Sequence, residues 1–101
     1  MAFRIKQSDT SPSLEATLLP VNIPSATVML HMKALGGSVV LDEQMTITDA
    51  VGGVVQYDWQ VGDTSTVGTY YVEFEVTYSD GAVETFPNTG NLPLVITREL
   101  N

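Results

Sequence analysis

The sequence predicts an all-β sandwich, and three features of its pattern support that prediction. Apolar and polar residues alternate with a period of two in many short stretches, which is the spacing of side chains on the two faces of a strand. Turn residues separate these stretches at roughly eight- to twelve-residue intervals, as in sandwiches and barrels. Valine, threonine and tyrosine, which pack well on pleated sheets, are abundant, and no stretch has a convincing helical period.

Polar and glycine-rich breaks divide the first half of the chain into five predicted strands. In the third of them, Val28, Leu30 and Met32 share one face, while His31 and Lys33 lie on the other. Two prolines bracket a predicted loop between the second and third strands. The five predicted ranges are residues 3–6, 14–18, 27–33, 38–41 (a short edge strand) and 45–49, where Met45, Ile47 and Asp49 form one alternating set.

The second half of the chain contains the strongest strand pattern, at residues 69–78. Its even-numbered residues are all apolar or aromatic and form one unbroken face. Ser79, Asp80 and Gly81 follow as a tight hairpin turn, because Asp-Gly suits positive φ angles. A further strand is predicted at 54–59, and a last one at 82–86 that resumes at 92–97 after a break. We therefore expect about seven to eight strands, within the number usual for sandwiches.

A corner motif makes this sandwich immunoglobulin-like. Such domains enter a central strand through a Gly-x-Tyr-x-apolar step, in which the tyrosine hydroxyl bonds back across the corner. Gly68, Tyr70 and Val72 have that spacing, with Val72 where antibody domains place a cysteine. Trp59 precedes this corner, so the domain is not of the antibody type. The full prediction is one immunoglobulin-like antiparallel β-sandwich domain spanning residues 1–101.

Composition excludes several classes of partner and site. Twelve acidic residues against four basic ones give a net charge of −8, which opposes binding to nucleic acids and to anionic membranes. The chain has no cysteine, which rules out disulfides, thiol catalysis and zinc–thiolate sites. No stretch has the apolar length of a signal peptide or a membrane span. We expect a protein that is made and folded in a cytoplasm.

The titratable residues do not predict an active site. His31 is the sole histidine, so a general base would have to be this residue. It lies mid-strand on the same face as Lys33, and a cationic neighbour suits a solvated sheet face better than a catalytic imidazole. Glu73 and Glu75 lie on the open face of one strand, where no pocket is implied. We therefore predict no catalytic residue and a protein that is not an enzyme.

The acidic and aromatic residues are the remaining candidates for binding sites. Calcium prefers several carboxylate and carbonyl oxygens, but the acids show no D-x-D-x-D loop spacing. No metal or cofactor is therefore predicted. Most aromatic residues are assigned inward by alternation, whereas Tyr71 projects outward beside Glu73 and Glu75, which makes these three the candidate contact surface. The calcium candidates considered are Asp42, Glu43, Asp49, Asp58 and Asp63.

Five groups of residues, taken in their order and spacing, resemble one group of phage proteins. They are residues 3–12, 25–28 leading into 30–32, 47–50 with 53–57, 68–74, and 80–81 with 85–87. On these the chain resembles the immunoglobulin-like N-terminal domain of tailed-phage baseplate upper proteins and related phage structural proteins of the neck, head fibre and decoration type. The resemblance spans nearly the full length but departs at residues 19–24, which are shorter than the family's usual turn. It supplies no catalytic residues.

The resemblance implies a structural component of a tailed-phage virion. Because baseplate proteins continue beyond this domain, we expect a free-standing neck, connector, baseplate, head-fibre or decoration component. Its partners would be portal, connector, tail or capsid proteins, and it would form a homo-oligomer or ring in the symmetric particle. An adsorption module that binds host-surface glycan through Tyr71 and the acidic loops, with or without calcium, is the alternative. A small hydrolase that uses His31 or the glutamates is a third hypothesis.

Overall fold

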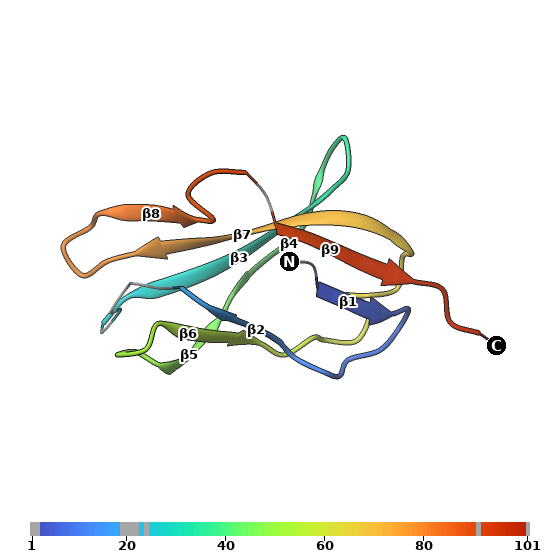
Figure 1. Ribbon diagram of the computed structural model, residues 1–101, viewed down its shortest axis with the longest axis horizontal. Coiled ribbons are helices and arrows are strands. Elements are labelled where there is room, and N and C mark those ends of the chain that lie inside the picture. Colours follow the sequence, from blue (N-terminus) through green and yellow to red (C-terminus); the bar gives the residue numbers. More distant parts are fainter. Residues whose placement is uncertain (1–2, 19–22, 24, 91, 101) are drawn as a thin grey trace.

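The computed structural model describes residues 3–18, 23, 25–90 and 92–100, and these residues form nine β-strands in two packed sheets (Figure 1). The described part contains no helix, and so none that is long and apolar enough to cross a membrane. The strands are β1 (Phe3–Lys6), β2 (Leu14–Thr17), β3 (Thr27–Ala34), β4 (Val39–Gln44), β5 (Thr46–Asp49), β6 (Val54–Tyr57), β7 (Gly68–Thr77), β8 (Val83–Phe86) and β9 (Leu92–Thr97).

The larger sheet is built around β7, the strand with the strongest sequence pattern. It has six strands in the order β1-β9-β7-β3-β4, and β8 also pairs with β7. One edge of β7 pairs with β3 along eight residues. The other edge is divided, because β9 pairs with residues 68–72 of β7 and β8 pairs with residues 74–77. The predicted last strand therefore lies along one edge of β7 as two pieces.

The smaller sheet has three strands in the order β2-β6-β5 and packs beneath the larger one (Figure 1). The pairing within both sheets is antiparallel except between β1 and β9, which run parallel. This arrangement confirms the predicted all-β, immunoglobulin-like sandwich, in which two sheets pack face to face. The parallel pair was not predicted, because alternation within a strand carries no information on the direction of its neighbour.

The core lies between the sheets and consists of the residues that alternation assigned inward. Val28, Leu30, Val72, Val76 and Leu94 are fully buried there. Burial of such side chains contributes roughly 1.5–3 kcal/mol each, which makes this layer the main stabilising element of the fold. The ring of Trp59 packs edge-on to that of Tyr57, with centroids 5.4 Å apart, and thus belongs to the core.

The chain crosses from the larger to the smaller sheet at Met45. Its side chain is buried, and its backbone N–H donates to the carbonyl of Val28 at 2.8 Å. This crossing separates β4 from β5, so the prediction of an edge strand limited to 38–41 was wrong and β4 extends to Gln44. A register shift between Ile47 and Asp49 leaves Asp49 exposed, whereas the alternation grouped it with Met45 and Ile47.

Turns between strands follow the sequence signals closely. At the predicted hairpin, the N–H of Gly81 donates to the carbonyl of Tyr78 at 2.9 Å, and Gly81 has a φ of +90°. Strand β6 ends at Tyr57, two residues earlier than predicted. The loop predicted between the second and third strands falls largely on residues 19–22 and 24, which lie outside the described residues.

Candidate functional site

The predicted corner residues have the geometry of a tyrosine corner. The hydroxyl of Tyr70 donates to the backbone carbonyl of Thr66 at 2.6 Å, which ties the start of β7 to the preceding loop. Gly68 has a φ of +158°, which residues with a side chain rarely adopt, and Val72 is fully buried. All three residues therefore serve the fold at this corner and are not exposed for contact with a partner.

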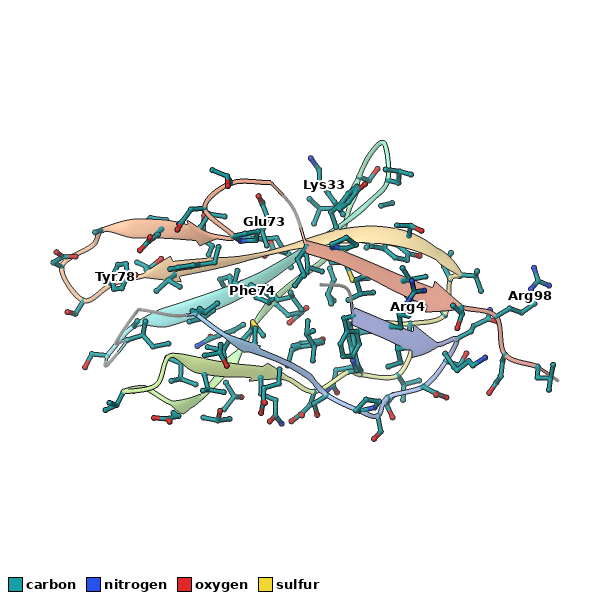
Figure 2. All side chains as sticks on the ribbon, in the orientation of Figure 1. Arg4, Lys33, Glu73, Phe74, Tyr78 and Arg98 are labelled. Atoms are coloured by element: carbon teal, nitrogen blue, oxygen red, sulfur yellow. The ribbon has the colours of Figure 1, made fainter. Side chains whose placement is uncertain are left out.

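The candidate contact surface lies on the outer face of the larger sheet. Tyr71, Glu73 and Glu75 are half-buried on the side of β7 that faces solvent. Figure 2 shows Glu73 pointing away from the smaller sheet, whereas Phe74 points toward it. Tyr71 lies opposite Lys33 of β3 and Pro93 of β9. The structure therefore brings the three predicted residues together along one strand, as their period requires.

His31 is held on this outer face between two carboxylates. Its Nδ1 lies 3.0 Å from Oδ1 of Asp42 on β4, and its Nε2 lies 3.6 Å from Oε1 of Glu75 on β7. Neither carboxylate was predicted as a neighbour of His31, because both come from neighbouring strands. Both ring nitrogens are turned toward carboxylates, so the ring connects three adjacent strands. This geometry suits a surface histidine that lies between two carboxylates.

The remaining acidic candidates support local structure. Oδ1 of Asp49 accepts the N–H of Gly52 at 3.0 Å in a turn. Hydrogen bonds from Ser13 and then from Gln56 lower the pKa of Asp58, whose Oδ1 lies 2.6 Å from the Ser13 hydroxyl.

Asp63 has a similar role in the loop before β7. Its Oδ2 accepts the hydroxyl of Tyr57 at 2.6 Å and the N–H of Gln60 at 2.8 Å. Burial, followed by this bond to Asp63, raises the pKa of the Tyr57 hydroxyl well above its ordinary value. Among the residues that the structure describes, no group of three or more histidine and acidic side chains is arranged to hold a metal ion.

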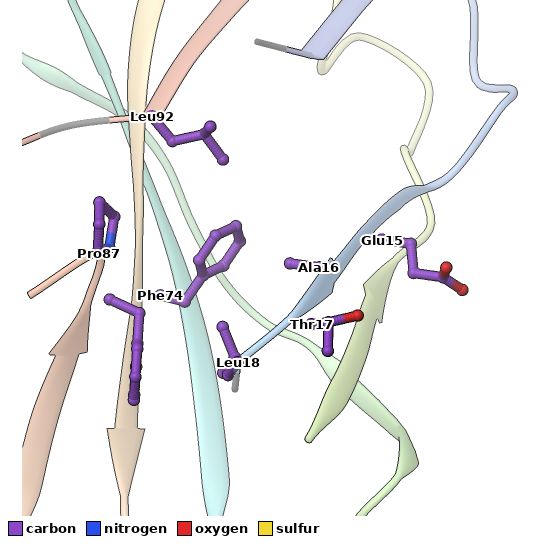
Figure 3. Close-up of a pocket in the computed structure, with 8 residues that line it drawn as sticks. Glu15, Ala16, Thr17, Leu18, Phe74, Pro87 and Leu92 are labelled. Carbon is purple, nitrogen blue, oxygen red and sulfur yellow. The ribbon is translucent and has the colours of Figure 1, made fainter. Parts of the chain in front are cut away.

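A groove with a largely apolar lining lies between the two sheets, and it was not predicted from the sequence. It has a volume of about 440 Å³ and opens beside β2 (Figure 3). Phe74 and Phe86 are only 3% and 8% exposed, whereas Ala16 and Leu92 are half-buried. Figure 3 shows Phe74 and Leu92 on one side of the groove and Ala16 and Leu18 on the other. The apolar lining is Ala16, Leu18, Phe74, Phe86, Pro87 and Leu92.

Among the described residues, none pairs with the outer edge of the strand beside this groove. The N–H of Leu18 donates to the carbonyl of Gly53 at 2.7 Å, which continues the β2–β6 ladder by one pair. Because hydrogen-bonded pairs alternate in an antiparallel ladder, Glu15 and Thr17 direct their backbone groups away from β6. Strand β2 is also the end strand of its sheet. The backbone of Glu15 and Thr17 therefore faces the position of an additional strand.

The rim of the groove is held by side-chain hydrogen bonds. The amide of Asn88 donates to Oε2 of Glu84 at 3.1 Å and to the carbonyl of Thr85 at 3.0 Å. The hydroxyl of Tyr78 donates to Oε1 of Glu84 at 2.7 Å, which joins β8 to the end of β7. These bonds position the turn that carries Pro87, so the groove is preformed on its β8 side.

Two signals in the sequence relate to this groove. Ala16 is a small residue at an inward position between the larger Leu14 and Leu18, and the break after Phe86 interrupts the last strand. Each of these signals concerns a single strand. That the two lie across from each other follows from the pairing of the sheets, which a single sequence does not show.

Comparison with known proteins supports the fold and does not extend to function. No protein-family model matches the chain, and a search of the curated proteins finds no match. Among solved structures, CopC from Methylosinus trichosporium OB3b is similar, with a TM-score of 0.64 and 16% sequence identity over 99% of this chain and 87% of that chain. At this identity, the likeness bears on the β-sandwich architecture alone.

Proposed function

We propose that this domain is a non-catalytic structural component of a tailed-phage virion, acting through protein–protein contact in a symmetric assembly. Its place would be the neck, the head–tail connector region, the baseplate or a head-fibre or decoration site. The reason for proposing a phage virion is the resemblance of the sequence to phage structural domains. Portal, connector, tail or capsid proteins would be its partners there, and copies of the chain would follow the symmetry of the particle.

The observation that carries a contact function is the free edge of β2 beside an apolar groove. Unpaired backbone groups at a sheet edge are a template for pairing with another chain, and natural proteins usually cover them. Here Glu15 and Thr17 present such groups next to the half-buried side chains of Ala16 and Leu92. An apolar groove together with a free edge can supply both affinity and alignment to a partner.

Mass spectrometry of purified virions from the phage that encodes the chain tests this proposal. We expect the particle to contain the chain at a copy number that reflects the order of one of the particle's symmetry axes. Deletion of the gene should yield particles that lack it and are defective in assembly or stability. Virions that are purified intact, infect normally and never contain the chain would overturn the proposal.

Binding to a host-surface glycan is the second candidate, and one observation favours it. Tyr71 borders a shallow hollow on the outer face together with Lys33, Gly36 and Gly37. An aromatic ring offers an apolar surface to a sugar, and a lysine ammonium donates hydrogen bonds to its hydroxyls. A glycan array probed with and without calcium, using the wild type and Tyr71→Ala, tests this. Binding that is lost in Tyr71→Ala would favour adsorption, and an array without signal would exclude it.

A further inference from the structure

We propose that the groove beside β2 accepts an extended strand from a different protein, with apolar side chains at alternate positions and basic side chains between them. The inference rests on the proposed contact function and names the partner's chemistry. The added strand would pair with the free edge of β2 and become the fourth strand of the smaller sheet. Three properties of the groove support this occupant.

The first property is the backbone geometry of the edge. Glu15 and Thr17 direct their N–H and C=O groups outward from a strand of four residues. A partner strand placed about 4.7–4.9 Å from β2 would form the next ladder with these groups. A helix or a compact loop would leave them unpaired against an apolar surface, which is costly. The edge therefore selects an extended segment.

The second property is the period of the lining. Ala16 and Leu18 point toward the groove, while Glu15 and Thr17 point to the outer face of the smaller sheet. A strand beside β2 would follow the same alternation, so every second side chain would enter the groove. There it would meet the rings of Phe74 and Phe86 and the side chain of Leu92. Apolar side chains are favoured in this apolar groove, whereas burial of a charged side chain there would be costly.

The third property is charge. Glu15 is the charged residue at the groove, and its side chain is exposed on the face where the partner's alternate residues would lie. Opposite charges on neighbouring strands attract, so a lysine or arginine is favoured there. The chain's net charge of −8 extends this preference to approach from solution. A second copy of the chain would bring the same charge, and we therefore assign the groove to a different protein.

A synthetic peptide of alternating lysine and valine, with blocked ends and a fluorescent label, is the probe for this site. A matched peptide with glutamate in place of lysine is its control. We expect fluorescence anisotropy at low ionic strength to show binding of the lysine peptide that is roughly tenfold or more tighter than that of the glutamate peptide. Hydrogen exchange measured by NMR should show new protection at the amides of Glu15 and Thr17.

Two variants locate the peptide. Ala16→Asp places a carboxylate in the groove and should weaken binding roughly tenfold or more. Val40→Asp, on β4 at one end of the larger sheet, is the matched control and should leave binding unchanged. Glu15→Lys changes an exposed residue and preserves the core, so it keeps the test valid if Ala16→Asp does not fold. It should reduce the preference for the lysine peptide over the glutamate peptide.

The proposal is overturned if neither peptide binds, if protection appears on β4 and not on β2, or if Glu15→Lys leaves the preference unchanged. These outcomes are separate from the virion test. Virions that lack the chain would remove the proposed function, whereas peptide binding at β2 would still establish the groove. Virions that contain the chain, combined with peptides that do not bind, would retain the contact function and exclude this groove as its site.

Discussion

Two edge strands of this sandwich, β2 and β4, differ in what surrounds their free edges. Strand β4 ends the larger sheet, and five of its six residues are exposed. It carries Asp42 and Glu43, and its register with β3 shifts between Met32 and Lys33. Strand β2 ends the smaller sheet, has a regular register with β6, and lies beside an apolar groove.

The two edges differ in features that affect pairing with another chain. Charges and a register shift are the devices by which natural sheets discourage pairing with another chain, and β4 has both. The turn between β3 and β4 also projects from the body of the molecule (Figure 1). Val39 and Val40 of β4 are exposed. On β2, Glu15 is the sole charge, and the groove offers burial to whatever pairs there. Strand β4 therefore has features that discourage pairing with another chain, whereas the edge of β2 lies beside an apolar groove.

The largest contrast between the edges should appear when the side chains behind them are shortened. Phe74→Ala removes a ring that is both core and groove floor, and we expect it to lower the free energy of unfolding by about 3–5 kcal/mol. Val40→Ala, on the β4 side, should change it by no more than about 0.5 kcal/mol, because this side chain is 48% exposed. Urea denaturation followed by tryptophan fluorescence measures both values. Equal losses would contradict the contrast.

An intermediate effect is expected at the corner that supports the β4 side. Tyr70 lies opposite Ala34 at the end of β3, and Tyr70→Phe would remove its hydroxyl bond to Thr66. We expect a loss of about 0.5–1.5 kcal/mol in the free energy of unfolding, the usual range for one hydrogen bond. Tyr71→Phe, on the outer face of the same strand, is the matched control and should have little effect. A larger loss for Tyr71→Phe would refute the structural role of the corner.

A smaller effect, limited to alkaline pH, is expected on the β8 side of the groove. Burial and then the bond to Glu84 raise the pKa of Tyr78 to about 12, from a model-compound value of 10.0. Because the folded state holds this proton more tightly, its stabilising contribution is complete below pH 10 and is lost as the pH rises toward 12. Thermal melting between pH 8 and pH 11.5 should therefore fall less steeply for Tyr78→Phe than for the wild type. Parallel curves would exclude this linkage.

The smallest effect is expected at the ion pair on β4. Asp42→Asn removes the carboxylate that lies 3.0 Å from His31, but the Asp42 side chain is 56% exposed. Such surface pairs contribute about 0.2–1 kcal/mol, and we expect a loss near the lower limit. Denaturation in low and high salt, with Glu43→Gln as the matched control, measures it. A loss comparable to that of Phe74→Ala would show that the β4 edge is a stabilising element after all.

The sequence predicted the strands and the corner because both are local patterns. Alternation at residues 69–78 corresponds to β7, which spans Gly68–Thr77. The spacing of Gly68, Tyr70 and Val72 places a hydroxyl within reach of a carbonyl four residues earlier, and the structure has that bond. Such features depend on the residues of one segment, so a single sequence contains enough information to predict them.

Features that depend on which strands are neighbours could not be predicted in this way. The carboxylates beside His31 come from β4 and β7, and the groove combines Ala16 of β2 with Phe74 of β7. Alternation assigns a residue to a face of its own strand but does not specify the strand beside it. The crossing at Met45 was missed for the same reason, since a buried methionine fits a continuous strand as well as a change of sheet.

The groove is a composite of segments that are far apart in the chain. One wall belongs to β2, near the N-terminus, and the other belongs to β7, β8 and the start of β9. Contacts between such distant segments carry an entropic cost, because the intervening chain must be ordered to bring them together. The groove therefore exists only in molecules whose two sheets have already packed. Under the proposed contact function, a partner strand could therefore bind only to copies of the chain whose two sheets have packed.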